Sequence, residues 1–319
     1  MNVSDPLVCI VVLNWNGLKD TVECLESLQK ITYPNHKVVV VDNASASDDV
    51  RILRDRFGAY AHIIQNDKNY GYTGGNNVGI RYGLQSVKAD YLLVLNNDTT
   101  VAPDFLGHLV HTAESDPAIG VAGPKVYYRD LPDRIQSAGM KVNMWTGQST
   151  LIGGRRLDAG QHDTLQEVDS VSGCCLLIKR LAIESVGEFD ERYFCYWDET
   201  DYCARIRKAG LKVMYVPEAR IWHRMPMKQR LLDSTPTAGK SAAVSQYFVA
   251  RNHFRFMRRH ATRLQYATFL ACFFGYHLWF MVALCLLYHR DTRALAGFFR
   301  GTIDGLFRPV DEPTFKPED

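Results

Sequence analysis

The sequence predicts an α/β domain with a mostly parallel sheet, followed by a C-terminal helical extension that associates with a membrane. Over the first 125 residues, short continuous apolar runs alternate with amphipathic stretches, the pattern of strands covered on both faces by crossover helices. With 319 residues and 46% apolar content, the chain can also bury a large core, which excludes a disordered protein. We expect the α/β domain over residues 1–225 and the basic, hydrophobic extension over residues 226–319.

Strands are expected where a short apolar run lies between turn signals. The run at 91–95 is continuous and should be a central strand, and Pro217 is expected to end the last strand. Residues 127–167 contain five glycines and little periodicity, so we expect loops and short strands there. The predicted strands are residues 8–13, 38–41, 61–65, 91–95, 119–122, 171–178 and 213–216.

Helices are expected between these strands, from apolar stripes and from residues that favour helix ends. The first helix is marked by the stripe Val22, Leu25 and Leu28, with Asp20 and Glu23 as a capping pair. Ser47 is expected to cap a helix near residue 48, and Pro103 to open one at its first turn. Further helices are predicted at residues 74–85, 181–186 and 199–209, the last stopped by Gly210.

Short polar side chains follow three of the predicted strands. They are Asn14 to Gly17, then Asp42 and Asn43, then Asn96 to Thr99. In an open, doubly wound sheet, ligands bind beyond the carboxyl ends of the strands. Polar side chains there can bind a base and ribose, and a carboxylate among them can hold a divalent cation. Asp42 alone is equally well explained as a turn or cap residue, so only the combination is specific.

Three further segments carry candidate chemistry. The run 69–77 is rich in glycine and opens a helix, so backbone N–H groups there could approach a phosphate, although turn-forming glycines explain it equally well. Residues 194–203 place Asp198, Glu199 and Asp201 beside aromatic residues, which suits either a general base or an acidic helix start. His223 follows the last strand, and a lone histidine is more often a packed residue than a ligand.

In this order, and with residues 39–45 and 172–178, these motifs closely resemble glycosyltransferase family 2 over residues 6–225. They look most like its rhamnosyltransferase branch, with galactofuranosyltransferases as near relatives. Tyr247, Arg251 and Asn252 match that branch's recurrent Tyr-x-x-x-Arg-Asn segment. The resemblance implies the GT-A fold of nucleotide-diphospho-sugar transferases, with a Rossmann-like sheet.

The resemblance also implies an inverting, metal-dependent glycosyltransferase of cell-surface glycan synthesis. The expected reaction moves a sugar, L-rhamnose from dTDP-rhamnose in the first place, to a lipid-linked or polysaccharide acceptor. A galactofuranosyl or N-acetylhexosaminyl transfer from a UDP-sugar is the alternative. Other classes are a non-catalytic, membrane-docked nucleotide-sugar-binding protein and a nucleotidyltransferase. The last is disfavoured because no basic, glycine-rich loop follows the first strand.

Individual roles carry over by position. Asp98 and His223 match the ligands of Mn²⁺ or Mg²⁺, and Glu199 matches the catalytic base, with Asp198 as the alternative. Two positions depart from the family pattern, since Asn96-Asn97-Asp98 replaces Asp-x-Asp and the base is Glu where Asp is commoner. The expected acceptor contacts are Gly173, Trp197 and Asp201. The expected nucleotide-sugar contacts are Asn14, Asn16, Asp42, Asn43, Asn69, Gly71, Gly75, Asn76, Asn96 and Asn97.

The extension combines a basic and an apolar segment. Residues 220–263 hold ten Lys or Arg and one acid, whereas residues 264–288 hold no charge and are long enough to cross a bilayer. Because basic residues flank both ends, we expect a hairpin or interfacial helix on the anionic leaflet, which suits a lipid-linked acceptor. A true span, a buried helix of a soluble domain and a homodimer interface are alternatives. Nucleic acid is not an expected partner, because no stacking platform accompanies the basic residues.

The cellular compartment is predicted from the cysteines and the N-terminus. The eight cysteines contain no CxxC pair and no zinc-like spacing, which is typical of a reducing compartment. Residues 1–7 lack the basic start and apolar region of a secretory signal. We therefore expect the protein at the cytoplasmic face of the inner, or plasma, membrane.

Overall fold

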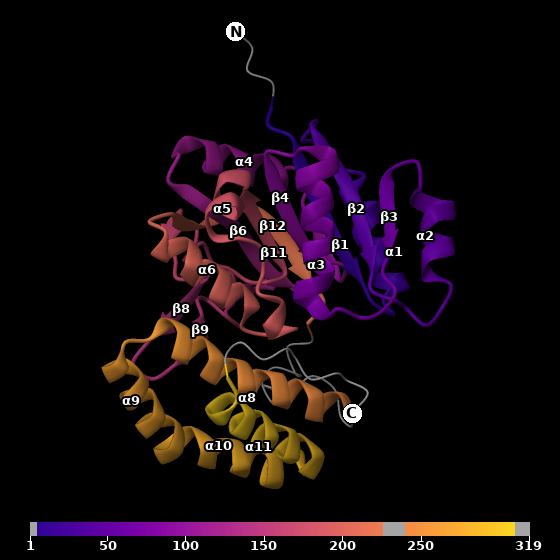
Figure 1. The fold of residues 1–319 in the computed structure, drawn as a ribbon. Helices are drawn as coiled ribbons and strands as arrows, with labels where there is room; N and C mark the ends of the chain where they lie inside the picture. The colour runs from indigo at the N-terminus through magenta and orange to yellow at the C-terminus, as the bar shows by residue number, and fades with distance from the viewer. Residues whose placement is uncertain (1–4, 226–239, 310–319) are drawn as a thin grey trace.

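The computed structural model describes residues 5–225 and 240–309, and most of the first 225 residues form a sheet covered by helices (Figure 1). Among the described residues, ten strands make one mixed sheet whose main order is β10-β12-β6-β11-β4-β1-β2-β3. The strands β1, β2, β3 and β4 are parallel, as predicted. The strands are β1 (Val8–Asn14), β2 (His36–Asp42), β3 (Ala61–Gln65), β4 (Tyr91–Asn96), β5 (Thr99–Val101), β6 (Ile119–Tyr128), β7 (Leu131–Ser137), β10 (Gln166–Glu167), β11 (Cys175–Lys179) and β12 (Lys212–His223), with a separate hairpin of β8 (Met140–Asn143) and β9 (Gln148–Leu151).

Helices bury both faces of this sheet, which explains the continuous apolar runs of its strands. Side chains of α1, α2 and α4 pack with Val8, Ile10 and Val12 on one face, and those of α3, α5 and α6 pack with Cys9 and Val11 on the other. The helices are α1 (Leu18–Leu28), α2 (Asp49–Phe57), α3 (Gly71–Tyr82), α4 (Phe105–Ser115), α5 (Arg180–Val186) and α6 (Asp198–Lys208).

The glycines of α3 let this helix approach the sheet closely. A Cβ atom at Gly75 would lie 2.5 Å from a side-chain carbon of Leu13, and one at Gly79 would lie 2.3 Å from Val11. Both separations are far below van der Waals contact, so any larger residue would push the helix away. The helix begins at Gly71, three residues before the predicted start, and these glycines serve helix–sheet packing.

Strand β12 differs from its prediction, because it does not end at Pro217. It continues to His223, with a register shift against β6 between Val216 and Arg220. A bulge accommodates the proline, which cannot donate a ladder hydrogen bond. His223 is therefore the last residue of a strand and not part of a loop. Strand β11 is in turn shorter than predicted and begins at Cys175.

Two predicted helix caps are wrong for a shared reason. Asp20 and Glu23 lie inside α1, which begins at Leu18 without a side-chain cap, and both carboxylates bind Arg129 and Arg224. The Ser47 hydroxyl bonds the side chain of Asp49, 2.5 Å away, and caps no backbone group of α2. In each case the polar side chain bonds a charged side chain and not the backbone at the helix start, because hydrogen bonds to charged groups are stronger.

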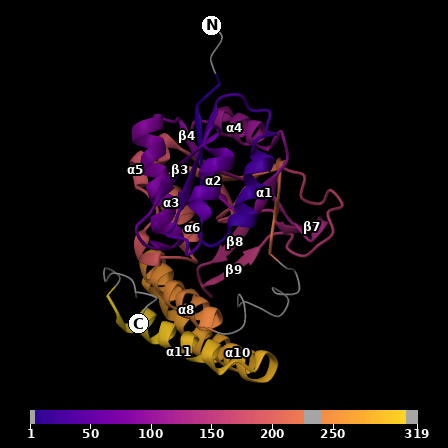
Figure 2. The same cartoon turned by 90° about the vertical axis from the view of Figure 1, so that its right-hand side faces the viewer.

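The C-terminal helices form a layer against one end of the sheet domain (Figures 1 and 2). Helix α8 lies between that domain and the outer helices, and α11 packs along it so closely that a Cβ at Gly301 would lie 2.2 Å from the carbonyl oxygen of Tyr247. The helices are α8 (Lys240–His260), α9 (Arg263–Cys272), α10 (Leu278–Ala283) and α11 (Thr292–Phe307).

The basic residues of α8 do not behave as expected. Arg251 and Arg255 are buried, at 4% and 7% exposure, and both bind carbonyl oxygens of the sheet domain. Arg259 pairs with Asp190 and Asp201. These three charges hold two parts of the protein together, so they are not available to lipid headgroups.

Candidate active site

The predicted polar residues meet at one edge of the sheet. The carboxyl end of β4 lies beside the start of β11, where Leu95 pairs with Cys175 and the Asn96 N–H donates to the Cys174 carbonyl at 2.9 Å. Since β1 and β2 run parallel to β4, their ends reach the same edge. The sheet topology thus brings Asp42, Asp98 and Gly173 to one side of the molecule.

Asp42 is a buried carboxylate held by three neighbouring groups. The Asn14 amide donates to it at 2.7 Å, as does the Ser45 hydroxyl at 2.7 Å, and the Ser45 N–H donates at 3.0 Å. Asn14 is itself fully buried and also donates to Asp49 at 3.0 Å. Asn16 is exposed, with a φ of 52°, and its side-chain oxygen accepts from the Ala46 N–H at 2.8 Å. Asn14 therefore orients Asp42.

Asn43 and Asn69 brace the glycine-rich loop. The Asn43 amide donates to the Asn69 side-chain oxygen at 2.8 Å and to the Gly71 carbonyl at 3.0 Å. The Gly71 N–H donates to Asn69 at 2.8 Å, and the Thr73 N–H to Phe194 at 3.1 Å. Protein groups thus occupy N–H groups that were expected to approach a phosphate. Gly71 has a φ of +73° and no room for a Cβ, which would lie 2.5 Å from the Phe194 ring.

Asn76 and Asn97 are also turned into the protein. The Asn76 amide donates to the Tyr72 carbonyl at 2.9 Å, while its buried side-chain oxygen has no partner. The Asn97 amide donates to the Thr21 hydroxyl at 2.8 Å, which ties the end of β4 to α1.

Asp98 and His223 form a close pair because β5 folds back along the end of β12. Thr99 pairs with His223 in that ladder, and the carboxylate Oδ1 of Asp98 lies 3.1 Å from Nε2 of the imidazole. The other ring nitrogen, Nδ1, lies 2.9 Å from Oε1 of Gln136, an oxygen that can only accept a hydrogen bond. In the tautomer with its proton on Nδ1, the ring donates to Gln136 and presents the lone pair of Nε2 towards Asp98.

The Asp98 and His223 pair has the donor set of a cation site. Oδ1 of Asp98 is buried without a hydrogen-bond partner and lies 3.1 Å from Nε2 of His223. A shared proton or a shared divalent cation would satisfy both atoms, and imidazole with carboxylate suits Mn²⁺ or Zn²⁺. Asn96, whose amide lies 3.4 Å from Nε2, is a third neighbour. In the described residues, no cluster of three or more His, Cys, Asp or Glu could hold a metal, so other ligands would come from substrate and water.

Asp198 and Glu199 begin helix α6 and differ in exposure. Asp198 is buried, and burial first, then the charge of Glu199, raise its pKa well above the ordinary range. Glu199 is half-buried and lies against Gly173, where a Cβ atom would be 3.5 Å from the Glu199 Cβ. The Tyr72 hydroxyl donates to the Gly173 carbonyl at 2.5 Å. The raised pKa favours the protonated form of Asp198, which cannot accept a proton, so Glu199 is the better candidate base.

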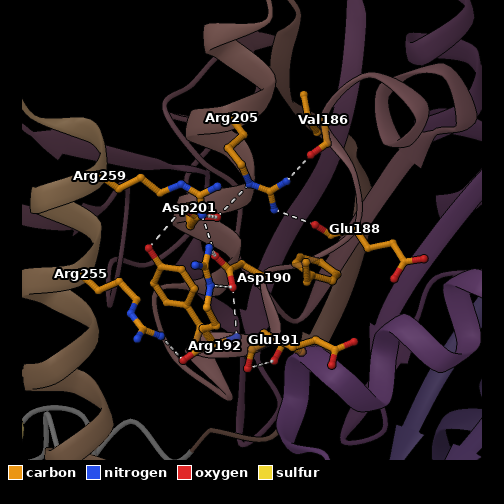
Figure 3. A network of polar contacts seen from close by, with 12 residues as sticks. Val186, Glu188, Asp190, Glu191, Arg192, Asp201, Arg205, Arg255 and Arg259 are labelled. Atoms are coloured by element: carbon orange, nitrogen blue, oxygen red, sulfur yellow. Dashed lines mark hydrogen bonds and ion pairs between the residues drawn. The ribbon is translucent and has the colours of Figure 1, made fainter. Parts of the chain in front are cut away.

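Two expected acceptor contacts point elsewhere. The Trp197 ring stacks on His253 of α8, with centroids 4.5 Å apart and planes 10° from parallel. Asp201 is fully buried and faces α8, where it binds Arg259 (Figure 3). It also binds His260 of the same helix. The structure does not place Asp201 where it could contact an acceptor, because the helix turns residue 201 away from residue 199 and towards protein partners, which also include Tyr193 and Arg205.

Sequence reasoning assigned no role to several residues of this edge. Gln136 lies in the region without clear periodicity, where nothing marked it. Tyr72 lies in the run 69–77 and Ser45 in the run 39–45. Their polar side chains, next to the expected ligands, could have indicated a role at the site. Arg251 and Asn252 were noticed only as a recurrent segment.

Comparison with known proteins identifies the family. Residues 6–255 match the family model for "Glycosyltransferase like family 2". The chain belongs to this glycosyltransferase family. A similar protein is the N-acetylglucosaminyl-diphospho-decaprenol L-rhamnosyltransferase of Mycobacterium tuberculosis, which is 30% identical to this glycosyltransferase over 222 residues. The match covers 62% of this chain and 70% of the relative. It is 25% identical to the low-salt glycan biosynthesis hexosyltransferase Agl10 of Haloferax volcanii, covering 97% and 92% of the two chains.

Solved structures confirm the GT-A fold of this glycosyltransferase. The mannosyltransferase PcManGT of Pyrobaculum calidifontis, in complex with GDP-Man and Mn²⁺, superposes with a TM-score of 0.57. The match covers 96% of this chain and 88% of that protein at 16% identity, so it supports the fold and nothing further. The family and fold predictions are thereby confirmed.

Proposed function

We propose that this glycosyltransferase is an inverting, metal-dependent enzyme that transfers a sugar from a nucleoside-diphosphate donor to a lipid-linked or polysaccharide acceptor. The observation that carries the proposal is the placement of the Asp98–His223 pair and of Glu199 beside Gly173 at one edge of the sheet. L-Rhamnose from dTDP-rhamnose is the first candidate donor, because a relative is named an L-rhamnosyltransferase. The lipid-linked acceptor is supported by the same name.

Asp98 and His223 would hold the divalent cation, Mn²⁺ or Mg²⁺. When bound, such an ion neutralises the charge that builds on a diphosphate leaving group. In the tautomer whose Nδ1 donates to Gln136, the Nε2 lone pair would be directed at the ion. Asp42, held by Asn14 and Ser45, would bind the nucleoside.

Glu199 would act as the general base. Its carboxylate takes the proton of an acceptor hydroxyl while the hydroxyl oxygen forms a bond to the anomeric carbon. The bond from that carbon to the diphosphate breaks on the opposite side, so the configuration inverts and the nucleoside diphosphate leaves. The Gly173 backbone lies against Glu199, and the Tyr72 hydroxyl holds this backbone in place.

A panel of nucleoside-diphosphate sugars tests the donor and the metal together. The correct donor, with Mn²⁺ or Mg²⁺, is expected to stabilise the folded protein by about 2.7 kcal/mol at a concentration of 100 Kd. Thermal unfolding measures this as a rise in Tm. Asp98→Asn should abolish the difference between metal and chelator, whereas Asp55→Asn, an exposed carboxylate of α2, should preserve it.

Each result of the panel separates one alternative. Protection by UDP-sugars alone would replace rhamnosyl transfer with galactofuranosyl or N-acetylhexosaminyl transfer. Protection without turnover on any acceptor would favour a non-catalytic nucleotide-sugar-binding protein. Equal protection of the wild type with metal and with chelator would refute the metal site.

The outer C-terminal helices are proposed to lie on the cytoplasmic face of the plasma membrane. One continuous helical stretch in the described chain, Arg263–Leu287, contains α9 and α10 and is long and apolar enough to span a bilayer. Its inner side packs on α8 and α11 through Phe269, Phe273 and Met281, all at most 4% exposed. Its outer side is apolar and exposed, with the large side chains Leu264, Phe274, Tyr276, Trp279, Phe280, Leu286 and Leu287.

An interfacial position fits this packing better than a span. Helix α11 contacts the middle of this helix, where the Phe273 and Phe298 rings are 6.1 Å apart, and α11 carries Arg293 and Arg300. A span would draw these charges into hydrocarbon, which is costly. Helices lying flat keep the charges in the headgroup region. A reducing compartment is supported by the eight cysteines, which contain no CxxC pair and no zinc-like spacing.

Trp279→Glu with Phe280→Glu is expected to release the protein from anionic vesicles, because it removes aromatic area and adds repelled charge. Flotation on phosphatidylglycerol-containing vesicles measures the bound fraction. Leu181→Glu is the matched control, since Leu181 on α5 is 67% exposed and Trp279 is 64% exposed. Unchanged flotation of the double variant would contradict the proposed membrane face.

A further inference from the structure

The segment that leads into α6 has an unusual backbone. Phe194, Tyr196 and Trp197 have φ values of 65°, 65° and 66°, in the left-handed region that side chains with a Cβ rarely adopt. Bulky aromatic residues are especially unfavourable there, so such a backbone persists only where the surroundings hold it. The next two residues are Asp198 and Glu199, so this segment sets where the candidate base lies.

Helix α8 supplies a partner for each of these three residues. The Phe194 ring stacks on Phe248 at 4.9 Å, and the Trp197 ring stacks on His253 at 4.5 Å. The hydroxyl of Tyr196 donates to the Ser245 hydroxyl at 3.2 Å. Each side chain with a strained backbone is thus held by one residue of the same helix.

Asn252 holds the backbone itself. Its amide nitrogen lies 2.9, 2.7 and 2.9 Å from the carbonyl oxygens of Tyr193, Cys195 and Tyr196, which share its two hydrogens. The Arg251 guanidinium donates to the Asn252 side-chain oxygen at 2.8 Å and so fixes the orientation of the amide. It also donates to the Arg192 carbonyl at 2.7 Å. Asn252 is fully buried and Arg251 nearly so, which strengthens these bonds.

The rest of α8 braces the same region from the other side. Arg259 reaches Asp190 and Asp201, and Arg255 donates to the Arg192 carbonyl (Figure 3). Asp201 lies one turn into α6, and its carboxylate also binds Arg205 of the same helix at 2.9 Å. These contacts fix α6 as a body, whereas the contacts of Arg251 and Asn252 fix the turn before it.

We infer that α8 positions the base, with Arg251 and Asn252 as positioning residues that hold the 193–197 turn in its strained conformation. This inference rests on the proposed function of Glu199. Without the Asn252 bonds, the turn relaxes towards negative φ and rotates the start of α6, while Asp201 and the buried Tyr202, Cys203 and Ile206 keep the body of the helix in place. The position of the Glu199 carboxylate relative to the acceptor therefore changes, whereas the donor site does not.

Asn252→Asp tests this directly, because it retains the side-chain size and the acceptor for Arg251 but loses the donors. We expect kcat for transfer to drop about 100-fold, the loss expected for a misplacement of about 1 Å, with the donor KM changed less than about threefold. The assay uses the donor found by the panel and polyprenyl-diphosphate-N-acetylglucosamine in detergent micelles. Hydrogen exchange should rise at residues 193–199 and stay low at residues 202–206.

Thr302→Val is the matched control, because it removes a buried hydrogen bond within α11, from the Thr302 hydroxyl to the Phe298 carbonyl at 2.9 Å, and this bond does not involve the turn. It should leave kcat, the pH profile of kcat and the exchange at 193–199 unchanged. Asn252→Asp should move the acidic limb of that profile, which a loss of stability alone would not do. Unaltered kcat and pH profile in folded Asn252→Asp would overturn the positioning role, whereas a wild type that transfers no sugar would instead overturn the proposed function.

Discussion

Glu199→Gln is expected to lower kcat for sugar transfer by about 10²- to 10⁴-fold, the usual contribution of a general base. The amide has nearly the shape of the carboxylate but cannot take a proton from the acceptor. Nucleotide binding in the presence of metal should change little, because Asp42, Asp98 and His223 remain. Single-turnover transfer and calorimetric titration of the nucleoside diphosphate measure the two effects separately.

Asp198→Asn is the comparison for this variant. Burial and the neighbouring Glu199 raise the pKa of Asp198 and so favour its neutral form, which an amide resembles in charge and shape. The loss in kcat should therefore be much smaller than for Glu199→Gln. The reverse order of the two losses would assign the base to Asp198 and contradict the role given to Glu199.

Asp201→Asn is expected to lower the free energy of unfolding by about 3–5 kcal/mol, as when one partner of a buried ion pair is removed. The Asp201 side chain is fully buried and binds Arg205, Arg259 and His260, which would lose their common anion. Urea unfolding at pH 7 measures the change. Asp169→Asn removes a partly exposed pair with Arg207 and should cost about 1 kcal/mol or less.

The Asp201 effect should also depend on pH in a defined direction. Burial alone would raise the pKa of Asp201, but the hydrogen bond from His260 and the charges of Arg205 and Arg259 outweigh it and hold the pKa below its ordinary value. A lowered pKa stabilises the folded state above the unfolded pKa of about 3.9, and that stability is lost as the pH falls through the folded pKa. The difference between wild type and Asp201→Asn should therefore narrow below about pH 4.

A second group affects both proteins equally. Burial lowers the pKa of His253 to about 3, with the charge of His277 acting in the same direction. The unfolded chain then binds the proton first, so the folded state of both proteins loses stability between about pH 6.5 and pH 3. The difference between the two proteins removes this contribution of His253. A difference that stays constant down to pH 3 would contradict the ionised state of this carboxylate.

The strands of the sheet were predictable because burial on two faces imposes a local pattern. The strands Val8–Asn14, His36–Asp42 and Tyr91–Asn96 begin and end within two residues of the predicted ranges. Helix starts were less predictable, because a capping signal competes with distant charges. Asp20 and Glu23 bind Arg129 and Arg224, and Glu23 is 106 residues from Arg129. Strand β12 passes Pro217 because a bulge absorbs the missing donor.

The kinds of residue at the site were recognisable from the chain. Polar residues that follow buried strands must emerge at one edge of a parallel sheet, so the ordered motifs were enough to identify the glycosyltransferase family and to place Asp42, Asp98 and Glu199 near that edge. The direction of each side chain was not recognisable. Asn14, Asn43 and Asn97 follow the same strands, yet they bind protein groups and hold the loops.

The roles of Gln136, Asp201 and Asn252 depended on segments that are distant in the sequence. Gln136 orients His223 from 87 residues away, and Asn252 holds a turn that precedes it by more than 50 residues. Hydrophobic periodicity reflects the burial of one face of a helix or strand, so it can be read from neighbouring residues in the sequence. Whether a polar side chain meets a substrate or supports its own backbone depends on the segment packed against it, and that contact forms only when the whole chain is folded.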